Sequence, residues 1–473
     1  MGEWNRRRFI SSAAIAAGGG LAGWNVFASH GLLAQAPPAG VPDEILNPVE
    51  VSGAEAQPVM GKLPGQKRMY VLPDNAGEYH RVGSQVMKRI ARREDTGDVH
   101  ELATFTGNTG ATMPRHTYLS SHAAVLVMRG EIELEVGGDR WTMMRGDFAN
   151  LPPGTAHGWT MKSDGAQLAL FSMNHRVGSA FTAMGERQDG AQIPSNVPHE
   201  IPAAALVRAA AAGDFQLAPA TAPAPAGAAV RVTNKQLPVT PGAYVLADGG
   251  GERFGGNTFL ARNANTTGQF LFIITEGGPG GGVGAHFHAR HFENFFALDG
   301  ETLGWAYGKA VPLRTGDYFQ APPRNLHGFR LNQDYNRFAA FLTPGIFESF
   351  FTRGGGGGRG RGDGAGRGGA APAGRGGDEG RGRAGFAGGA AEMFRSLQMS
   401  GRGPDGYPLD VHPAKLPLPP QDPIWTKGAA SGLADRAALL AHAQAICGVP
   451  ISREITPELR RALLLKPRPE DFI

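Results

Sequence analysis

Side chains with the chemistry of metal ligands gather in the segment GGVGAHFHARHFENFFALDG, residues 281–300, which contains three histidines and a glutamate. His286 and His288 are two residues apart, so on a β-strand both side chains point to one face. Glu293 follows His288 by five residues, which is the wrong parity for a single straight strand. The spacing therefore predicts a turn at ARHF and a second strand, ENFFAL, that begins at Glu293.

A fourth candidate ligand, His327, follows a proline-rich turn in GDYFQAPPRNLHGF, residues 316–329. Imidazoles and a carboxylate together suit a divalent transition metal. Histidines scattered over the surface of a hairpin are the alternative, which would be favoured for a single histidine but not for four donors at this spacing. We therefore predict one ion bound by His286, His288, Glu293 and His327. Iron, manganese, copper, nickel and cobalt all accept this donor set.

A second copy of the pattern lies upstream at a constant offset along the chain. With this offset, His286 aligns with His116 and His327 aligns with His157. The alignment needs no gap between these two positions. It also matches two glycines, an aspartate and a proline of each copy, namely Gly300, Gly316, Asp317 and Pro322 with Gly130, Gly146, Asp147 and Pro152. The matches in one ungapped frame predict a duplicated domain.

Both copies have the patterning of β-structure. GEIELEVGGDRW alternates apolar and polar residues and breaks at Gly137, Gly138 and Asp139, which is a hairpin signal. FLFIITEGG is typical of a buried strand, and RTGDYFQAPP of a turn followed by a strand. Helical periodicity is scarce before residue 390. We therefore predict an all-β fold of two tandem barrels or jelly rolls, with a short helical C-terminal extension.

The motif G-x5-H-x-H-x4-E-x6-G, followed by G-x5-P-x4-H, resembles the cupin signature. It is carried here by Gly280, His286, His288, Glu293, Gly300, Gly316, Pro322 and His327. Two such barrels in one chain resemble the bicupins, whose fold is the double-stranded β-helix. The sequence HFHARHFENFFALDG, together with PGIFESFF after the second barrel, looks most like that of the quercetinase-type flavonol dioxygenases. The resemblance covers roughly residues 70 to 350.

This resemblance implies a metal-dependent dioxygenase with a small-molecule substrate. Glu293 would be the catalytic base that takes a proton from the 3-hydroxyl group, and dioxygen would then cleave the heterocycle with loss of carbon monoxide. The residues themselves support the metal, the base and an apolar pocket. Candidates for the pocket wall are Phe295, Tyr318 and Phe329, for each of which ordinary barrel core is the alternative.

Two other classes of function stay open, because cupins host many chemistries on one barrel. One is a metal-dependent decarboxylase or isomerase of a small organic acid. It would require arginines in the pocket, whereas Arg290 and Arg324 fall on predicted turns. The other is a non-catalytic bicupin that binds a sugar or another metabolite.

The first copy departs from the motif, with Tyr118 in place of His288 and Ala123 in place of Glu293. His116 and His157 remain, and His122 lies one place out of frame. These three histidines could form a second, weak metal site. The favoured expectation is that this barrel has lost its site and serves as a structural or dimerising partner, which makes a homodimer an expectation as well.

The N-terminus, NRRRFISSAAIAAGGGLAGWNVFA, resembles a twin-arginine export signal, with Arg6, Arg7 and Phe9 in the motif. Its apolar run is short and rich in glycine, so a stable membrane span is not expected. We therefore expect a periplasmic or secreted protein. Ala28 and Ala36 are both candidate ends of the signal.

The net charge of +4 does not indicate a basic binding surface. The N-terminal signal contributes about +2, and the segment 352–391 contributes about +4, from seven arginines against three acidic residues. That segment holds much of the excess glycine and is predicted to be disordered. Repeats of this type bind RNA elsewhere, but an exported protein meets little RNA, so no nucleic acid partner is expected. A single cysteine, Cys447, excludes intrachain disulfides.

The tail after residue 391 begins with the proline-rich stretch HPAKLPLPPQDPIW and continues in two predicted helices. The predicted organisation has five parts, which are a signal peptide and spacer (1–36), a first barrel with a degenerate metal site (37–200), a second barrel with an intact site (228–351), the Gly/Arg-rich segment (352–391), and the proline-rich and helical extension (392–473).

Overall fold

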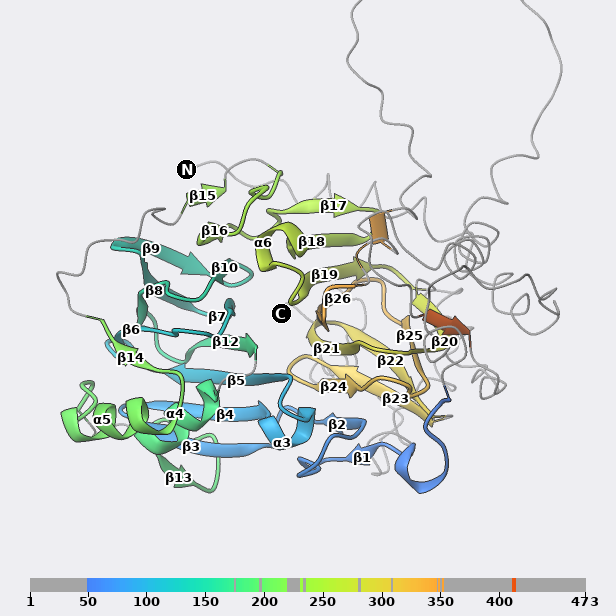
Figure 1. Cartoon of the computed structure of the whole chain (residues 1–473), viewed down its shortest axis with the longest axis horizontal. Coiled ribbons are helices and arrows are strands. Elements are labelled where there is room, and N and C mark those ends of the chain that lie inside the picture. Colours follow the sequence, from blue (N-terminus) through green and yellow to red (C-terminus); the bar gives the residue numbers. More distant parts are fainter. Residues whose placement is uncertain are drawn as a thin grey trace, which may run out of the picture.

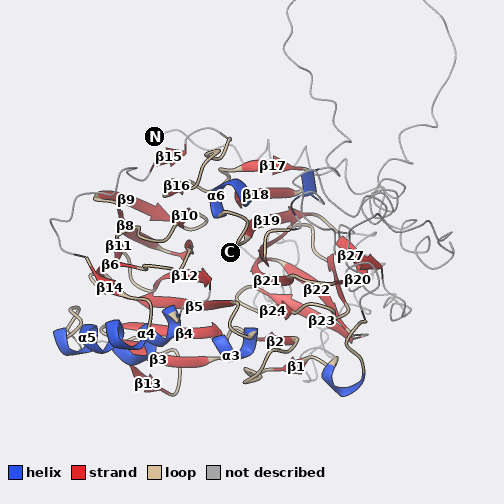
Figure 2. Cartoon of the chain, viewed as in Figure 1, coloured by secondary structure: helices blue, strands red, loops and turns tan. Residues whose placement is uncertain are grey.

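The computed structural model describes residues 49–173, 176–194, 198–218, 230–232, 235–279, 282–307, 309–346, 348, 351–352 and 411–413. The predicted export signal lies outside these residues. So do the Gly/Arg-rich segment, except for Thr352, and the C-terminal extension, except for 411–413. The described chain forms two barrels of β-strands that lie side by side (Figure 1). Figure 2 shows how few helices accompany them.

The first barrel combines a nine-stranded sheet and a five-stranded sheet around one apolar core. The larger sheet has the order β13 (Glu186–Gln188), β3 (Glu78–Val82), β4 (Gln85–Ala91), β5 (His100–Gly107), β12 (Ala166–Met173), β7 (Ala123–Arg129), β10 (Phe148–Leu151), β16 (Tyr244–Leu246) and β15 (Val230–Val232). The smaller sheet has the order β14 (Gln216–Leu217), β6 (Thr112–Thr117), β11 (His157–Met161), β8 (Glu131–Val136) and β9 (Asp139–Met144).

The second barrel has the same plan. Its eight-stranded sheet has the order β1 (Val59–Met60), β2 (Tyr70–Leu72), β24 (Tyr318–Ala321), β21 (Phe292–Asp299), β26 (Asn336–Thr343), β19 (Leu271–Gly277), β18 (Asn257–Ala261) and β17 (Glu252–Phe254). Its five-stranded sheet has the order β23 (Lys309–Arg314), β22 (Glu301–Ala306), β25 (His327–Leu331), β20 (Gly282–His288) and β27 (Val411–Pro413).

The predicted duplication is confirmed. Strands β8 to β12 and β22 to β26 begin and end at positions that differ by one constant offset, the same that places His286 on His116. The predicted hairpin is present as β8 and β9, which pair from Glu131 with Met144 to Val136 with Asp139. Burial alternates along β8, as its sequence predicts. FLFIITEGG and RTGDYFQAPP also contain the predicted strands, β19 and β24.

Each barrel is completed by a strand that precedes the other barrel in the chain. β2 pairs with β24 of the second barrel, and β16 pairs with β10 of the first. Equivalent hydrogen bonds fix both exchanges, since the amides of Asp74 and Asp248 donate to the carboxylates of Asp317 and Asp147, at 2.9 and 2.8 Å. The two barrels therefore exchange strands. The larger sheet of each barrel includes a strand that precedes the other barrel in the chain.

Gly316 shows why the motif needs a glycine beside this exchange. Its φ is +90°, a left-handed conformation that L side chains rarely adopt. A Cβ atom at this position would also lie against the Asp74 side chain of the exchanged arm. The motif glycine thus serves the contact between the barrels as well as the turn.

Two helices that the sequence did not predict lie between the last strands of the first barrel, after β12. They are α4 (Val177–Met184) and α5 (Ala203–Ala212), and they pack against each other and the first-barrel core. α5 is rich in alanine, and both helices are too short to show a clear helical period. Single helical turns are also present at η1 (Gly53–Glu55), α3 (Arg93–Thr96) and α6 (Asn263–Thr266).

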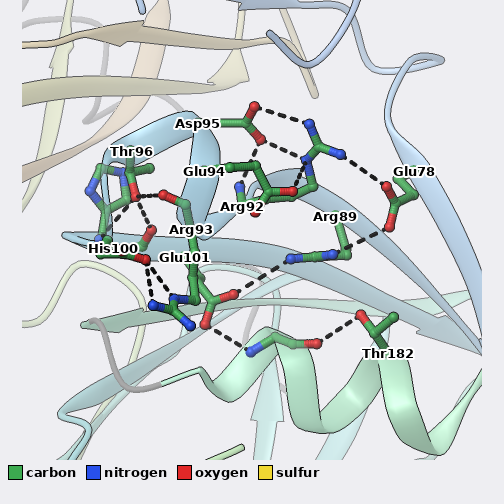
Figure 3. Close-up of polar contacts among 12 residues, drawn as sticks. Glu78, Arg89, Arg92, Arg93, Glu94, Asp95, Thr96, His100, Glu101 and Thr182 are labelled. Atoms are coloured by element: carbon green, nitrogen blue, oxygen red, sulfur yellow. Dashed lines mark hydrogen bonds and ion pairs between the residues drawn. The ribbon is translucent and has the colours of Figure 1, made fainter. Parts of the chain in front are cut away.

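A partly buried polar network attaches α3 and α4 to the first barrel (Figure 3). The Arg92 guanidinium donates to both carboxylate oxygens of Asp95, at 2.8 and 3.1 Å, and reaches Glu78 at 3.1 Å. The Glu101 carboxylate accepts the amide of Gly178, at 2.9 Å, in the first turn of α4. These contacts hold α4 against the strand that carries His100.

His100 and His122 project from the first barrel into aromatic surroundings of the second. His100 lies edge-on to Phe292 and Phe341, and His122 lies edge-on to Phe270. Burial lowers the pKa of His100 to about 3. Burial likewise lowers the pKa of His122 to about 4, although a hydrogen bond with Asn150 opposes the shift. Both rings are neutral in the folded protein at neutral pH.

We therefore expect acid to destabilise the folded protein. The unfolded chain binds protons on these histidines near pH 6.5, whereas the folded protein does so near pH 3 to 4. Their contribution to stability is thus complete above about pH 6.5 and falls by about 1.4 kcal/mol per pH unit per histidine as the pH drops towards 4. Urea denaturation between pH 7 and 5 measures the slope. An equal slope in the His100→Gln/His122→Gln variant would contradict this assignment.

Candidate metal centre

The four predicted ligands meet inside the second barrel. The donor atoms of His286, His288, Glu293 and His327 all lie within 4.8 Å of one another. The Glu293 carboxylate oxygen Oε2 is 2.8 Å from His288 Nε2, 3.0 Å from His327 Nε2 and 3.5 Å from His286 Nε2. His286 Nε2 and His288 Nε2 are 3.1 Å apart. The predicted site residues are thus brought together as one cluster.

Three strands position these side chains. β20 carries His286 and His288 on one face and ends at His288, as predicted. The turn then leads into β21, whose second residue is Glu293. β25 brings His327 opposite His286 in an antiparallel pair. The carbonyl of Asn325 holds Nδ1 of His327 at 2.8 Å, so Nε2 points to the cluster.

The electrostatics of the cluster suit metal binding. Burial lowers the pKa of His327, and burial together with the neighbouring His291 lowers the pKa of His288 well below its usual value. Burial by itself raises the pKa of Glu293, but its hydrogen bonds with the three imidazoles outweigh burial, so this pKa is well below its usual value. Neutral imidazoles and an ionised carboxylate are the protonation states that bind a metal ion.

The spacing of the donor atoms also fits one ion. Imidazole nitrogens that point lone pairs at each other across 3.1 Å need a proton or a cation between them. Ligand atoms at about 2.1 Å from a transition metal, at right angles to each other, are about 3 Å apart. The separations around Glu293 Oε2 and between His286 and His288 are of this size. His286, His288, Glu293 and His327 could therefore hold a divalent transition metal.

Two of the three predicted pocket residues lie on the same side of their strands as the ligands. Phe295 follows Glu293 by two residues on β21, and Phe329 follows His327 by two on β25. Their ring centroids are 5.3 Å apart. They belong to the apolar core and form an aromatic wall next to the site.

Tyr318, the third predicted pocket residue, points away from the metal ligands. Its hydroxyl donates to the side-chain oxygen of Asn294 at 2.9 Å, and its ring packs on Tyr70 of the exchanged strand. The neighbouring Phe319 takes the predicted place instead, with its ring stacked on Phe295 at 5.6 Å and 6.4 Å from the ring of His327. Strand pairing decides between these two adjacent residues, so sequence alone could not.

His291 is a second residue whose position the sequence did not predict. It stands in the expected turn, but its side chain is fully buried, and its ring centroid lies 3.8 Å from that of His288. The only signal in the sequence was that it is the third histidine of the segment. It supports the orientation of the His288 ring.

The first barrel keeps part of an equivalent cluster. His116 and His157 lie opposite each other on β6 and β11, as His286 and His327 do on β20 and β25. The Tyr118 hydroxyl is 3.1 Å from His116 Nε2, and His157 Nε2 is buried without a hydrogen-bond partner among the described residues. His122, the third predicted member, is not brought to them, because its Nε2 bonds to Asn150 at 2.9 Å beside the second barrel.

The comparisons with known proteins agree with this architecture. The family model described as "Cupin domain" matches residues 103–174 and 274–337, one segment in each barrel. A quercetin 2,3-dioxygenase of Bacillus subtilis (strain 168) is 32% identical over 293 residues, which cover 61% of this chain and 86% of that protein. A quercetin 2,3-dioxygenase of Aspergillus japonicus is 31% identical over 75 residues, 15% of this chain and 21% of that protein.

Among solved structures, an oxalate decarboxylase of Bacillus subtilis is 13% identical with a TM-score of 0.36, over 58% of this chain and 77% of that chain. The two matched cupin segments, the duplicated barrels and the extent of the similarity to the Bacillus subtilis dioxygenase lead to one conclusion. The chain belongs to the cupin family, as a two-barrel protein of the quercetin 2,3-dioxygenase type.

Proposed function

We propose that this protein is a metal-dependent dioxygenase that opens a flavonol-like or related aromatic, enolic substrate in its second barrel. The observation that carries the proposal is the position of one Glu293 oxygen, within 3.5 Å of three imidazole nitrogens and beside an aromatic wall. The similarity to two quercetin 2,3-dioxygenases supports it. When bound, the metal would supply a Lewis acid for an enolic oxygen and a meeting point for substrate and dioxygen.

The residues of the chain have distinct tasks in this proposal. His286, His288 and His327 hold the ion, and the backbone carbonyl of Asn325 fixes the ring of His327. Glu293 is ionised and accepts the hydroxyl proton of the substrate. Phe295, Phe319 and Phe329 form an apolar surface against which a planar ring can pack. The first barrel supports this site through the exchanged strand β2.

The alternative of a small organic acid as substrate has less support. A carboxylate substrate would gain from a second cation beside the metal, and both candidate arginines next to the motifs, Arg290 and Arg324, are exposed on turns. Both side chains thus lie at the surface and not within the buried cluster. This contrast favours an uncharged aromatic substrate.

Dioxygen consumption with quercetin as the substrate tests the proposal. We expect oxygen uptake together with release of carbon monoxide, both dependent on a metal-loaded protein. Anaerobic turnover of a carboxylic acid would indicate the decarboxylase class instead. Saturable binding of a metabolite with neither reaction would indicate a non-catalytic bicupin.

We also propose export through the twin-arginine pathway, on the basis of Arg6, Arg7 and Phe9. We expect the Arg6→Lys/Arg7→Lys precursor to stay in the cytoplasm, because lysines keep the charge but not the arginine pair. Cell fractionation measures the distribution, and Arg8→Lys is the matched control because it leaves the pair intact. Periplasmic delivery of the double variant would refute the proposal. Within the described part of the chain, no helix is long and apolar enough to cross a membrane.

A further inference from the structure

We propose that strand β27, Val411–Pro413, is a removable cover that controls access to the metal centre. The strand comes from the chain that follows the second barrel, far beyond the end of β26 at Thr343. It lies beside β20 at the edge of the smaller sheet (Figure 2). The proposal concerns access to the buried histidines and does not depend on which reaction they support.

The register places β27 directly at the ligands. β27 runs antiparallel to β20, with Val411 opposite His288, His412 opposite Phe287 and Pro413 opposite His286. The three residues thus span the part of β20 that carries the two ligand histidines. The edge of a strand is open to other chains unless something covers it, and here β27 covers that edge alongside the two ligand histidines.

The first barrel has a cover at the equivalent position. β14 pairs antiparallel with β6, and Leu217 lies opposite His116 just as Pro413 lies opposite His286. The residue before β14, Phe215, stacks on the His116 ring with centroids 4.6 Å apart. His116 and His157 are accordingly almost completely buried. A strand at this place therefore seals a cupin cluster from solvent.

Among the described residues, the contacts that attach the two covers differ. Next to β14, the Asp214 carboxylate accepts the amides of Leu119, Ser120 and Ser121, at 2.7 to 2.9 Å, and α5 lies directly before it. β27 is three residues long, and Pro413 has no amide hydrogen to donate. At most two of its three residues can therefore donate backbone hydrogen bonds to β20, so the strand can open without unfolding the barrel.

The burial of the metal ligands requires part of the chain to move before a ligand can reach them. All four ligands are buried, and the most exposed of them, Glu293, has a relative exposure of only 4%. A ligand larger than an ion cannot reach donors buried to this degree unless part of the chain moves aside. Release of β27 exposes the edge of β20 while the pairing of β20 with β25 stays in place.

The test uses the full-length protein and a variant that loses the remaining strand donors, Val411→Pro/His412→Pro. The matched control is Val411→Ala/His412→Ala, which changes the same side chains and keeps both amides. Hydrogen exchange of the peptide that contains β20 reports the pairing. Modification of His286 and His288 by diethyl pyrocarbonate, in protein stripped of metal, reports access to the site, and the rate of metal loss to EDTA reports it in the holoprotein.

We expect the proline variant to show faster exchange in β20 and roughly tenfold faster histidine modification and metal loss, while the alanine control behaves like the unaltered protein. Faster exchange with unchanged modification would mean that β27 only protects a sheet edge, and would overturn the proposal. Unchanged exchange would overturn it as well. If the purified protein bound no metal, the proposed function would fail, while exchange and modification would still decide the role of β27.

Discussion

Glu293→Gln is expected to abolish turnover while leaving much of the metal bound. Glutamine cannot accept a proton at neutral pH, and general-base help contributes roughly 10²–10⁴ in rate. Its side-chain oxygen can still face the ion, and three imidazoles remain. The Oε2 atom of Glu293 is the one that approaches all three histidine nitrogens, so a substitution that conserves size tests proton transfer at the centre of the cluster.

Metal content and oxygen uptake are to be measured on the same preparation of this variant. Glu301→Gln is a matched control, since it removes another buried carboxylate of the same barrel, one that pairs with Arg314 at 3.1 Å. The first barrel cannot supply a substitute base at the equivalent position, which is Ala123. Wild-type turnover would show that Glu293 is not the base, and joint loss of metal and activity would show that it acts mainly as a ligand.

His288→Ala is expected to remove the metal. The protein should carry about one ion per chain in the second barrel, and the variant should carry almost none. Loss of a side chain that merely orients a ligand typically costs roughly 10–100-fold in affinity, and loss of the ligand itself costs more. In this structure it also takes away the partner of Glu293 Oε2 at 2.8 Å and of His286 Nε2 at 3.1 Å.

Elemental analysis of the purified variant checks this expectation. The control is His122→Ala, because His122 is bound to Asn150 and lies away from both clusters. Full occupancy in His288→Ala would contradict the assignment of the ligands. Metal that remains in His288→Ala but is lost on further replacement of His157 by Ala would place a second ion at His116, Tyr118 and His157.

Much of the fold could be predicted because its signals are local or repeated. Alternation along GEIELEV and the Gly137–Gly138 break identify the β8–β9 hairpin within one short segment. The duplication was visible because the two copies keep one ungapped frame. Helices α4 and α5 were missed, since their short sequences carry little periodic signal and the helices are stabilised by packing on the first-barrel core.

The exchange of strands between the barrels was not predictable in the same way. YVL occurs both at Tyr70 and at Tyr244, and either copy suits a buried strand. Nothing in three apolar residues says which barrel they complete. The choice depends on contacts between distant parts of the chain, such as Asp74 with Asp317.

The sequence by itself identified His286, His288 and Glu293 as candidate metal ligands of the second barrel. His286 and His288 share a face because side chains alternate along a strand, and the turn before Glu293 restores the parity. These are local rules, so a short segment contains the information. The duplication suggested that His116, His122 and His157 could form a weak site in the first barrel, and the structure brings only His116 and His157 together.

The tertiary structure alone decided which residues surround that site. Tyr318 and Phe319 are adjacent, aromatic and buried, yet the pairing of β24 with β21 and β2 turns Phe319 to the ligands and Tyr318 to the other barrel. Tertiary contacts also direct His122 away from the first-barrel cluster, because its ring bonds to Asn150 and packs against Phe270. β27 reaches the ligands from a distant part of the chain. Side-chain direction along one strand is local, whereas the choice of neighbouring strand depends on packing across the whole fold.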